Sequence, residues 1–518
     1  MNKIKPFVFW PPFLLCAAAV VLNWLDKERF AAVMTHAHGW VTDNFGGFVS
    51  WLSLGMLLLC GVIYVSPFGR TTLGGPQAKP LLTKWQMFTV VLTTNIAAGI
   101  LFWCVYEPVS YLSKPPEGIQ PLTPEAAQFA ISKVYLNWTV IPYSIASIVG
   151  LMFAFAFYNM RKPFSLGAPL SPLLGKHGEG WIGQAIDAIC LYSLVAALAA
   201  ALVGSSMLMA GGIHHIFGIQ EAPSPLLLAI IIAAIMGTSV FAAISGVTKG
   251  IRHIANLNTA FLIGFLVLIL VLGPTRYIVQ FAFEGLGQFA GQFFQKALFL
   301  GPAGKEEWSR KLTQMLFSAF FAWAPIMGVF LGRIAYGYTV RSFLIFNVLL
   351  PALFTGTWMA IICGAAVNME LEGQSHLAAI LNPDKPDPAQ VLYAFLGQFQ
   401  FSSILVPILL VTAFLSFVTT ADGNTDAMSN ISTRGISPEK SESGMLVKIA
   451  WGSLMAVFCW MMTGLDGIRK LSDLGGFPAM FLCLAVSLSA IRVLMNPARF
   501  DVFHPKHPDY KKTGNENV

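Results

Sequence analysis

The segment FSAFFAWAPIMG, which begins at Phe317, carries the side chains of this sequence that are best suited to binding an organic cation. At helical spacing Phe320, Trp323 and Met327 share one face, and Phe317 and Phe321 share another. Tryptophan rings attract quaternary ammonium groups through their electron-rich faces. The first face is therefore a candidate ligand box, although such a stripe is also typical of helix packing. The second face is expected only to pack.

A second segment, WTVIPYSIA, places aromatic rings on both sides of a proline. Pro142 lacks a backbone hydrogen-bond donor in the middle of an apolar run, and Trp138 and Tyr143 flank it. Two proline-interrupted aromatic segments in different runs resemble the broken helices that form substrate sites in secondary transporters. Trp138 and Tyr143 are therefore candidate substrate-binding residues.

The segment TTNIAAG combines a polar side chain with small neighbours. Asn95, Ala97 and Gly99 allow helices to approach closely and allow the helix itself to unwind. An unwound backbone exposes carbonyl groups that can hold a cation or a polar ligand group. Asn95 and Ala97 are therefore candidate substrate-binding residues, with a packing seam of small residues as the alternative.

The segment FVTTADGNT places adjacent hydroxyl groups beside a carboxylate. Hydroxyl and carbonyl oxygens suit a hard cation such as Na⁺, so Thr419 and Thr420 are candidate Na⁺ ligands. Termination and capping of a helix by polar residues explains the same pattern, because these side chains readily bond to nearby backbone groups.

Motifs for enzymatic chemistry are missing from the sequence. It contains no G-x-x-x-x-G-K-[ST], and neither H-E-x-x-H nor G-x-S-x-G occurs in a supporting context. We therefore predict no catalytic residue, no organic cofactor and no enzymatic activity. The ion that the sequence suggests is Na⁺ as a coupling ion.

Apolar runs supply the elements that must position these residues. Of the 518 residues, 56% are hydrophobic and 11% are charged, and the mean hydropathy is +0.67. Soluble proteins carry roughly 25% charged residues. We therefore predict an all-α polytopic membrane protein with about 12 transmembrane helices, each spanning about 20 residues or more. The runs lie near 7–25, 46–66, 86–106, 128–158, 183–213, 224–246, 255–275, 312–335, 343–366, 396–418, 446–464 and 475–495.

Loop charges predict the orientation of the chain. Basic residues gather in the even-numbered loops, with Arg70, Lys79 and Lys84 in the second loop and Arg333 and Arg341 in the eighth. Acidic residues gather in odd-numbered loops. Because cytoplasmic loops carry an excess of Lys and Arg, both termini are predicted to lie in the cytoplasm, with the chain in the cell inner membrane. The net charge of +7 therefore reflects topology and does not indicate nucleic-acid binding.

A few polar side chains fall within the apolar runs. Lys133, Asp187 and Glu107 come nearest to membrane depth, where charge is costly enough that each merits a functional hypothesis. Anchoring at the membrane interface is the favoured explanation for Glu107 and Asp187. The seven cysteines lie in or beside apolar runs without C-x-x-C spacing, which indicates packing and not metal or disulfide chemistry.

The segment IVQFAFEGLGQFAGQFF, which begins at Ile278, follows the seventh run. Ala282, Leu286, Phe289 and Phe293 recur there at helical spacing among Gln and Gly. This pattern predicts an interfacial amphipathic helix, with an irregular loop as the alternative.

Four segments together resemble the betaine/carnitine/choline transporter family. They are ILFWCVYEPVSYLSKPPEG (100–118), KGIRHIANLN (249–258), WAPIMGVFLGRI (323–334) and FVTTADGNT (417–425). The resemblance extends from the third to the twelfth run. It implies two peripheral helices followed by a leucine-transporter-like inverted repeat of five plus five helices. The implied divisions are 1–85 for the tail and peripheral helices, 86–280 for the first repeat, 281–308 for the interfacial helix, 309–495 for the second repeat and 496–518 for a cytoplasmic tail.

The resemblance implies secondary active transport of a small betaine-like, choline-like or carnitine-like quaternary ammonium solute by alternating access. Trp138 matches an aromatic of the family's substrate box, and Trp323 matches the Trp that precedes the proline of the eighth span. The box is thinner here, since Phe320 stands where a box Trp usually stands and Tyr143 replaces another. A less methylated or bulkier amine is therefore an alternative substrate.

The coupling features of the family are mixed in this chain. Sodium-dependent members usually carry G-M-G-I-G where this chain reads NIAAG, but Thr419 and Thr420 keep the hydroxyls associated with one sodium site. Met327 resembles a methionine of the sodium-independent carnitine exchangers, yet those also carry Arg where this chain has Asn258. We expect Na⁺ symport through at most one site, with sodium-independent exchange as the alternative.

Two functions of another class compete with transport, namely a channel and a sensor that binds substrate without moving it. The expected partners are a small amine or zwitterionic solute and the lipid bilayer, and no nucleic acid. Family members often assemble as trimers, so the resemblance is consistent with a homotrimer.

Overall fold

The computed structural model describes residues 4–510 except 96, 117, 220, 245–249, 300–307, 382–386, 438–442, 464–467 and 509. Within helices, the description also leaves out the side chains of residues 20, 27, 95, 97–98, 250–252, 308–312 and 468–473.

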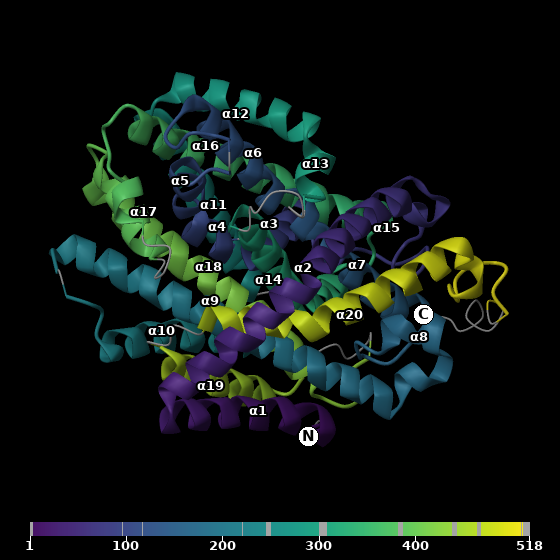
Figure 1. Ribbon diagram of the computed structural model, residues 1–518. Coiled ribbons are helices and arrows are strands. Elements are labelled where there is room, and N and C mark those ends of the chain that lie inside the picture. The colour runs from purple at the N-terminus through teal and green to yellow at the C-terminus, as the bar shows by residue number, and fades with distance from the viewer. Residues whose placement is uncertain are drawn as a thin grey trace.

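The described residues form a bundle of α-helices (Figure 1). In this part of the chain there is no β-strand, only two isolated bridges. The helices are α1 (Pro6–Leu25), α2 (Lys27–Val65), α3 (Lys84–Asn95), α4 (Ala97–Trp103), α5 (Tyr106–Ser113), α6 (Pro124–Trp138), α7 (Val140–Ala154), α8 (Ser171–Leu174), α9 (Trp181–Phe217), α10 (Pro225–Ile244), α11 (Gly250–Leu272), α12 (Thr275–Gly291), α13 (Phe293–Ala297), α14 (Trp308–Ile334), α15 (Val340–Leu344), α16 (Leu350–Leu371), α17 (Pro388–Gly397), α18 (Ser402–Ile431), α19 (Met445–Met462) and α20 (Ile468–Met495).

The prediction of an all-α chain with about twelve spans is confirmed. Among the described residues, 11 helices are long and apolar enough to cross a membrane, and the count rises to 12 if one bent pair forms a single span. The predicted run 128–158 lies in one long element, Pro124–Asn159, in which α6, α7 and a π-helical turn follow one another. The predicted run 183–213 lies in α9.

The third span is bent between α3 and α4. Its two parts, Lys84–Thr94 and Gly99–Ser113, meet at an angle of 49°. The break between the helices falls at residue 96, outside the described residues. The predicted interruption of this span therefore agrees with the change of direction on either side of it.

The tenth predicted run differs from the structure at both ends. Residues 388–397 form a separate helix, α17, and α18 continues past residue 418 to Ile431. The polar stretch after Phe417 thus lies inside a helix and does not terminate one. Its side chains bond back to the preceding turn, as when Thr420 Oγ1 donates to Ser416 O at 2.9 Å and Asn424 Nδ2 donates to Thr420 O at 2.7 Å. Such bonds satisfy polar groups without breaking the helix.

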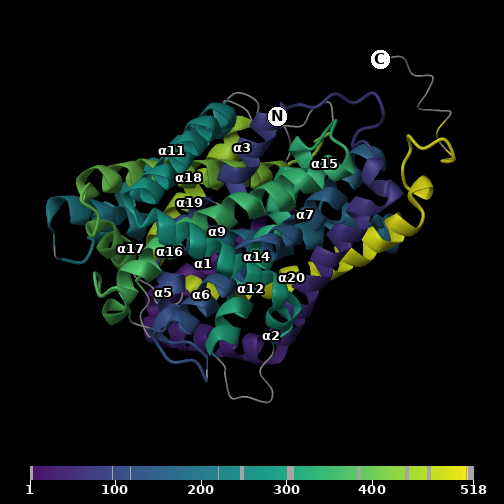
Figure 2. The ribbon, with the colours of Figure 1, turned by 90° about the horizontal axis from the view of Figure 1, so that it is seen from above.

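The helix contacts repeat between two sets of five. α3 and α4 of the first set pack against α18 of the second set. In the reverse direction, α14 of the second set packs against α9 of the first set. In the same way α10 and α11 contact α18, whereas α19 and α20 contact α9. Figure 2 shows α9 and α14 in the middle of the bundle. Two sets of five spans, an odd number, would start on opposite sides of the membrane, so these contacts are consistent with the inverted repeat that the resemblance implies. The boundaries 86–280 and 309–495 remain predictions.

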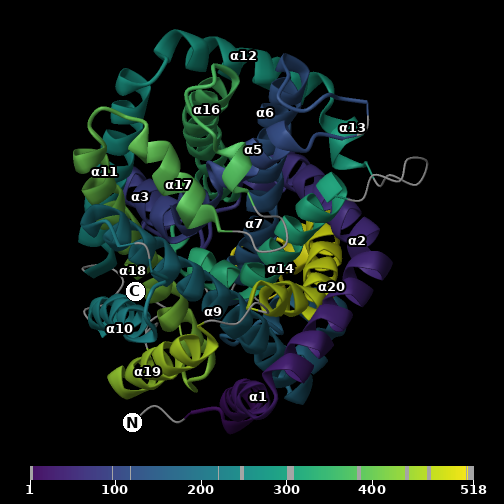
Figure 3. The same ribbon diagram turned by 60° about the vertical axis from the view of Figure 1, so that its left-hand side comes forward.

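Three helices lie at the edge of the bundle (Figure 3). α1 contacts α2, α9 and α19, and α2 lies against α7, α14 and α20. The amphipathic segment is helical, as α12, and packs on α6 and α16. Its Phe281 and Gly285 are buried and its Phe283 is exposed, so one side faces the protein. Its position at a membrane interface and the boundary 281–308 remain predictions.

Both ends of the described chain contact the connection between α7 and α9. Lys5 Nζ donates to Phe164 O at 3.1 Å and lies 3.6 Å from the Asp187 carboxylate. Val502 N donates to Asn159 O at 3.1 Å. The two termini therefore lie on the same side of the bundle, which an even number of spans requires.

Candidate functional site

Three of the predicted aromatic residues form one ring cluster, which consists of Trp138, Tyr143 and Phe320. The Phe320 ring centroid lies 6.1 Å from that of Trp138 and 6.4 Å from that of Tyr143, both in edge-to-face geometry. Such pairs are favourable because a positive ring edge meets a negative ring face. Residues 182 positions apart in the chain, counted as 320 − 138, thus meet at one place.

Glycines on α7 and α14 allow this meeting. A Cβ on Gly328 would lie 2.9 Å from the backbone nitrogen of Gly150, and one on Gly332 would lie 2.6 Å from the Gly150 carbonyl. The two helices therefore touch through their backbones, as small residues allow within membranes. This close approach holds Phe320 of α14 against Trp138 and Tyr143.

Polar partners outside the cluster tether two of its rings. Trp138 Nε1 donates to Glu107 Oε2 at 2.5 Å, and the Tyr143 hydroxyl lies 2.8 Å from Thr355 Oγ1. The opposite edge of the indole lies against Gly99, where a Cβ would come within 2.9 Å of the ring. The Trp138 ring is thus clamped between α4 and α5.

Glu107 is buried, so its interpretation as an interface anchor is wrong. Its exposed fraction is 1%, and its carboxylate also accepts a hydrogen bond from Asn137 Nδ2. Asn137 in turn bonds to the Tyr111 hydroxyl at 3.0 Å and accepts from Thr313 Oγ1 at 3.1 Å. Two donors on α6 thus bond to this carboxyl group, and such bonds offset part of the cost of burying it.

Asp187 is also buried, which contradicts the same interpretation. Its exposed fraction is 0%, and its carboxylate accepts from Leu166 N at 2.6 Å and from Ser165 Oγ at 3.1 Å. The Lys5 ammonium supplies the opposite charge. This carboxylate ties the connection between α7 and α9 to the start of α1, and it does not contact the ring cluster.

The opening segment divides only in part as its two faces predict, because Met327 of the first face is buried like the second face. Phe317 and Phe321 are fully buried and pack in the core, whereas Phe320 and Trp323 are half-buried. Met327 is buried, with an exposed fraction of 2%. Trp323 makes no ring contact with the cluster among the described residues, so the structure brings Phe320 into the cluster and leaves Trp323 one turn away.

The candidate Na⁺ ligands lie where α18 meets α3. Thr419 Oγ1 lies 3.1 Å from Thr93 O and 2.9 Å from Ser416 O. The neighbouring Thr94 hydroxyl is buried without a hydrogen-bond partner among the described residues. Gly423 faces Thr94, since a Cβ there would lie 2.6 Å from its methyl group. Hydroxyl and carbonyl oxygens thus gather next to the bend of the third span.

Asn258 of α11 contacts α18 next to these hydroxyls, at Ser416. Its amide donates to Ser416 Oγ at 3.0 Å, and the same Ser416 carbonyl accepts from Thr420 at 2.9 Å. The side chains of Asn95 and Ala97, the remaining candidates, lie outside the described residues.

A buried charge cluster escaped the sequence analysis. Arg333 is not a loop residue but the end of α14, with an exposed fraction of 5%, and it forms an ion pair with Asp426 of α18. Lys448 of α19 lies 3.0 Å from the other carboxylate oxygen and donates to Ala243 O at 2.7 Å. The one sequence feature that could have indicated this cluster is the run TTADGNTD, in which Asp426 follows Asp422 by one helical turn.

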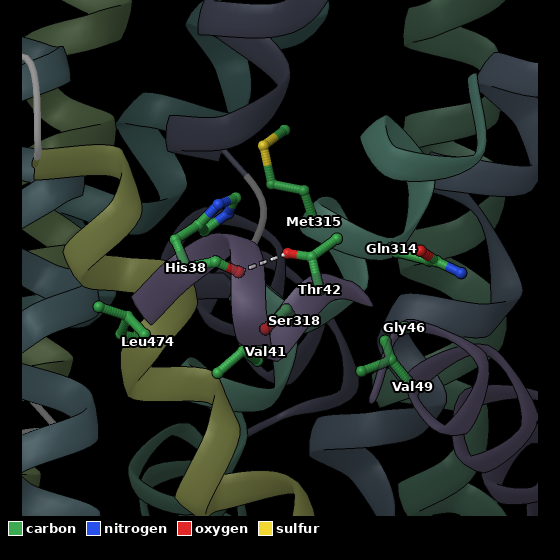
Figure 4. A pocket seen from close by; sticks show the side chains of 9 residues that line it. All are labelled: His38, Val41, Thr42, Gly46, Val49, Gln314, Met315, Ser318 and Leu474. Carbon is green, nitrogen blue, oxygen red and sulfur yellow. Dashed lines mark hydrogen bonds between the residues drawn. The ribbon is translucent and has the colours of Figure 1, made fainter. Parts of the chain in front are cut away.

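Two cavities lie elsewhere. A cavity of about 20 Å³ sits between α2, α14 and α20, and Figure 4 shows that Gln314 and Ser318 line it. That volume suffices for about one water molecule. A cavity of about 220 Å³ opens between α6, α12 and α16. Neither cavity is lined by Trp138, Tyr143, Phe320 or Trp323, so neither is the predicted site.

Comparison with known proteins gives matches over nearly the whole chain. The profile of BCCT, the betaine/carnitine/choline family transporters, matches residues 7–499. The chain is similar to the glycine betaine transporter OpuD of Bacillus subtilis, with 28% identity over 507 residues that cover 96% of both chains. It is also similar to a probable glycine betaine transporter of Desulfitobacterium hafniense, with 28% identity over 94% of this chain and 95% of that one. The high-affinity choline transport protein of Escherichia coli is 24% identical over 94% of this chain and 71% of its own.

Proposed function

The chain belongs to the betaine/carnitine/choline transporter family, and on that premise we propose that it is a secondary active transporter of a small quaternary ammonium solute. The observation that carries the proposal is the cluster of Trp138, Tyr143 and Phe320, which come from α6, α7 and α14. Electron-rich ring faces bind trimethylammonium groups. Relatives described as glycine betaine and choline transporters support the same substrate class.

Substrate binding requires movement of one ring. The Trp138 and Phe320 centroids are only 6.1 Å apart, whereas an ammonium group needs ring faces on two sides, each within about 6 Å of it. Trp138 and Tyr143 are tethered by hydrogen bonds, but a phenylalanine ring has no polar group to tether. Phe320 is also half-buried. We therefore propose that the Phe320 side chain moves to admit the substrate head group, and that Trp323 and Met327 line the path of the head group.

We further propose that Na⁺ is the coupling ion and binds between α3 and α18. Thr419 and Thr420 offer hydroxyl oxygens, and the nearby Thr93 carbonyl and Thr94 hydroxyl add two more of the hard type that Na⁺ prefers. An ion there would link the bend of the third span to α18. Sodium-independent exchange is the alternative.

The membrane setting completes the proposal. Both termini lie on one side of the bundle, and the excess of Lys and Arg in the even-numbered loops favours the cytoplasmic face of the inner membrane. A homotrimer, as in other family members, is the assembly we propose, and size measurement in detergent tests it.

Reconstitution into liposomes tests the function. We expect purified protein to accumulate labelled betaine, choline or carnitine when a Na⁺ gradient is imposed, with saturation and counterflow. Uptake that needs internal substrate but no Na⁺ would favour exchange. Conduction without saturation would identify a channel, and tight binding without uptake a sensor. If no trimethylammonium compound binds and less methylated amines do, the proposed substrate class is wrong.

A further inference from the structure

We propose that Glu107 is a positioning residue of the substrate site, which fixes the Trp138 ring and makes the site select a cationic head group over a neutral one of the same shape. The inference rests on the proposed function, because it concerns the same ring cluster. Glu107 lies on α5, outside the cluster, and reaches the substrate only through Trp138.

The geometry favours one orientation of the indole. Its nitrogen donates to Glu107 Oε2 at 2.5 Å, while the far edge of the ring abuts Gly99. A ring held at two opposite edges cannot turn without losing the hydrogen bond or colliding with α4. Phe320 lies beside this ring in edge-to-face geometry, with the centroids 6.1 Å apart.

The charge of Glu107 acts on the ring as well. A hydrogen bond to a carboxylate is stronger than one to a neutral acceptor, and such bonds polarise the donor group. Electron density pushed into the indole strengthens the attraction between its face and a cation. A neutral ligand of the same shape gains nothing from this density.

A neighbouring lysine limits the direct field of the carboxylate. Lys133 lies on α6 near Glu107, with an exposed fraction of 4%, and the two charges attract each other. An opposite charge beside the carboxylate weakens its direct field at a bound head group. The contact between Glu107 and the indole N–H is local and is not weakened in this way, so the effect on the substrate passes mainly through Trp138.

The chain offers a matched control. Asp187 is a second buried carboxylate that accepts hydrogen bonds and lies near a lysine, but its partners are Ser165 and Leu166, outside the ring cluster. Replacing Glu107 or Asp187 with the corresponding amide removes one buried charge in each case. Only the first replacement changes the ring.

The test compares choline with its neutral isostere, in which carbon replaces the nitrogen. We expect wild-type protein in detergent to bind choline at least about tenfold more tightly than the isostere. Glu107→Gln should lower this ratio about threefold to tenfold, chiefly through weaker choline binding. Asp187→Asn should leave the ratio unchanged. Trp138→Phe removes the N–H, and we expect that Glu107→Gln then has no further effect on the ratio.

Each outcome decides one point. If Glu107→Gln weakens choline and the isostere equally, or if it still acts in the Trp138→Phe background, the positioning role is wrong while the transport proposal stands. If wild-type protein binds neither compound nor any other trimethylammonium solute, the proposed function fails and the inference fails with it. Should Glu107→Gln not fold, Glu107→Asp decides: it keeps the acid but shortens the side chain away from the indole N–H, so the ratio should fall, and an unchanged ratio would contradict the positioning role.

Discussion

The proposed substrate region and the proposed ion region of this transporter are held together in opposite ways. In the ring cluster, polar groups from other helices tether the side chains, as Glu107 tethers Trp138 and Thr355 tethers Tyr143. At the junction of α3 and α18, the hydroxyls of Thr419 and Thr420 bond mainly to carbonyls of their own helix. Other helices therefore hold the rings in place, whereas Thr419 and Thr420 are held mainly by their own helix.

This contrast has a mechanical consequence. External tethers cross from one helix to another, so the rings keep their geometry only while those helices stay together. Hydroxyls that bond within a helix remain satisfied when the neighbouring helix moves. An ion could therefore join α3 to α18 and be released again without leaving the Thr419 and Thr420 hydroxyls unpaired.

Removal of the paired hydroxyls should have the largest effect. We expect Thr419→Val combined with Thr420→Val to reduce Na⁺-driven accumulation by about tenfold or more, because bonds to a charged partner contribute about 1.5–3 kcal/mol. Substrate binding without Na⁺ should be preserved, since the ring cluster does not touch these residues. Uptake measured against Na⁺ concentration, with equilibrium binding as the control, checks both expectations. If the Na⁺ dependence of uptake is unchanged in the double variant, Na⁺ does not bind at this junction.

Loss of a box ring should come next. Trp323→Leu is expected to weaken substrate binding by about threefold to thirtyfold, in line with a cation–π contribution of about 0.5–2 kcal/mol. Phe317→Leu is the matched control, because Phe317 belongs to the same helix but is buried in the core. It should lower thermal stability and leave affinity nearly unchanged. Equal losses of affinity in the two variants would show that the two faces of α14 are not distinct.

A small steric change should have a smaller effect. Gly99→Ala adds a Cβ that would lie 2.9 Å from the Trp138 ring, so the ring must shift by a few tenths of an ångström. We expect affinity for the quaternary ammonium substrate to fall by about threefold, a cost of less than about 1 kcal/mol. Gly237→Ala is the control, because no heavy atom lies within 4 Å of the added Cβ there. If the two variants bind alike, Trp138 is not clamped.

The weakest effect concerns pH and arises outside the ring cluster, where Lys296 Nζ donates to Ser132 Oγ of α6 at 2.6 Å. Burial and the nearby Lys133 lower the pKa of Lys296 on α13 to about 8. The unfolded chain keeps this proton at higher pH than the folded chain does, so stability should rise from about pH 8 up to the ordinary lysine pKa near 10.4. Thermal melting of wild-type and Lys296→Met across this range measures the difference. A slope equal in both proteins would contradict the shift.

The sequence predicted the helices well and the site in part. Apolar run length gave eleven or twelve spans, and helical spacing separated Phe320 from Phe317 correctly. It failed at α18, where the polar run after Phe417 suggested a helix end. Hydrophobicity does not report that polar side chains can bond to their own helix, and so a polar run inside a span cannot be distinguished from a helix terminus by composition.

The sequence by itself determined which segments enter the membrane and which face of each helix is aromatic, because both follow from local periodicity and hydropathy. Only the tertiary structure decided which charges are buried and with what partners. Glu107 meets Trp138 and Arg333 meets Asp426 through contacts between separate helices, and close backbone approach at Gly150 and Gly328 sets where the rings meet. Such pairings depend on how helices distant in the chain pack, and no local pattern encodes them.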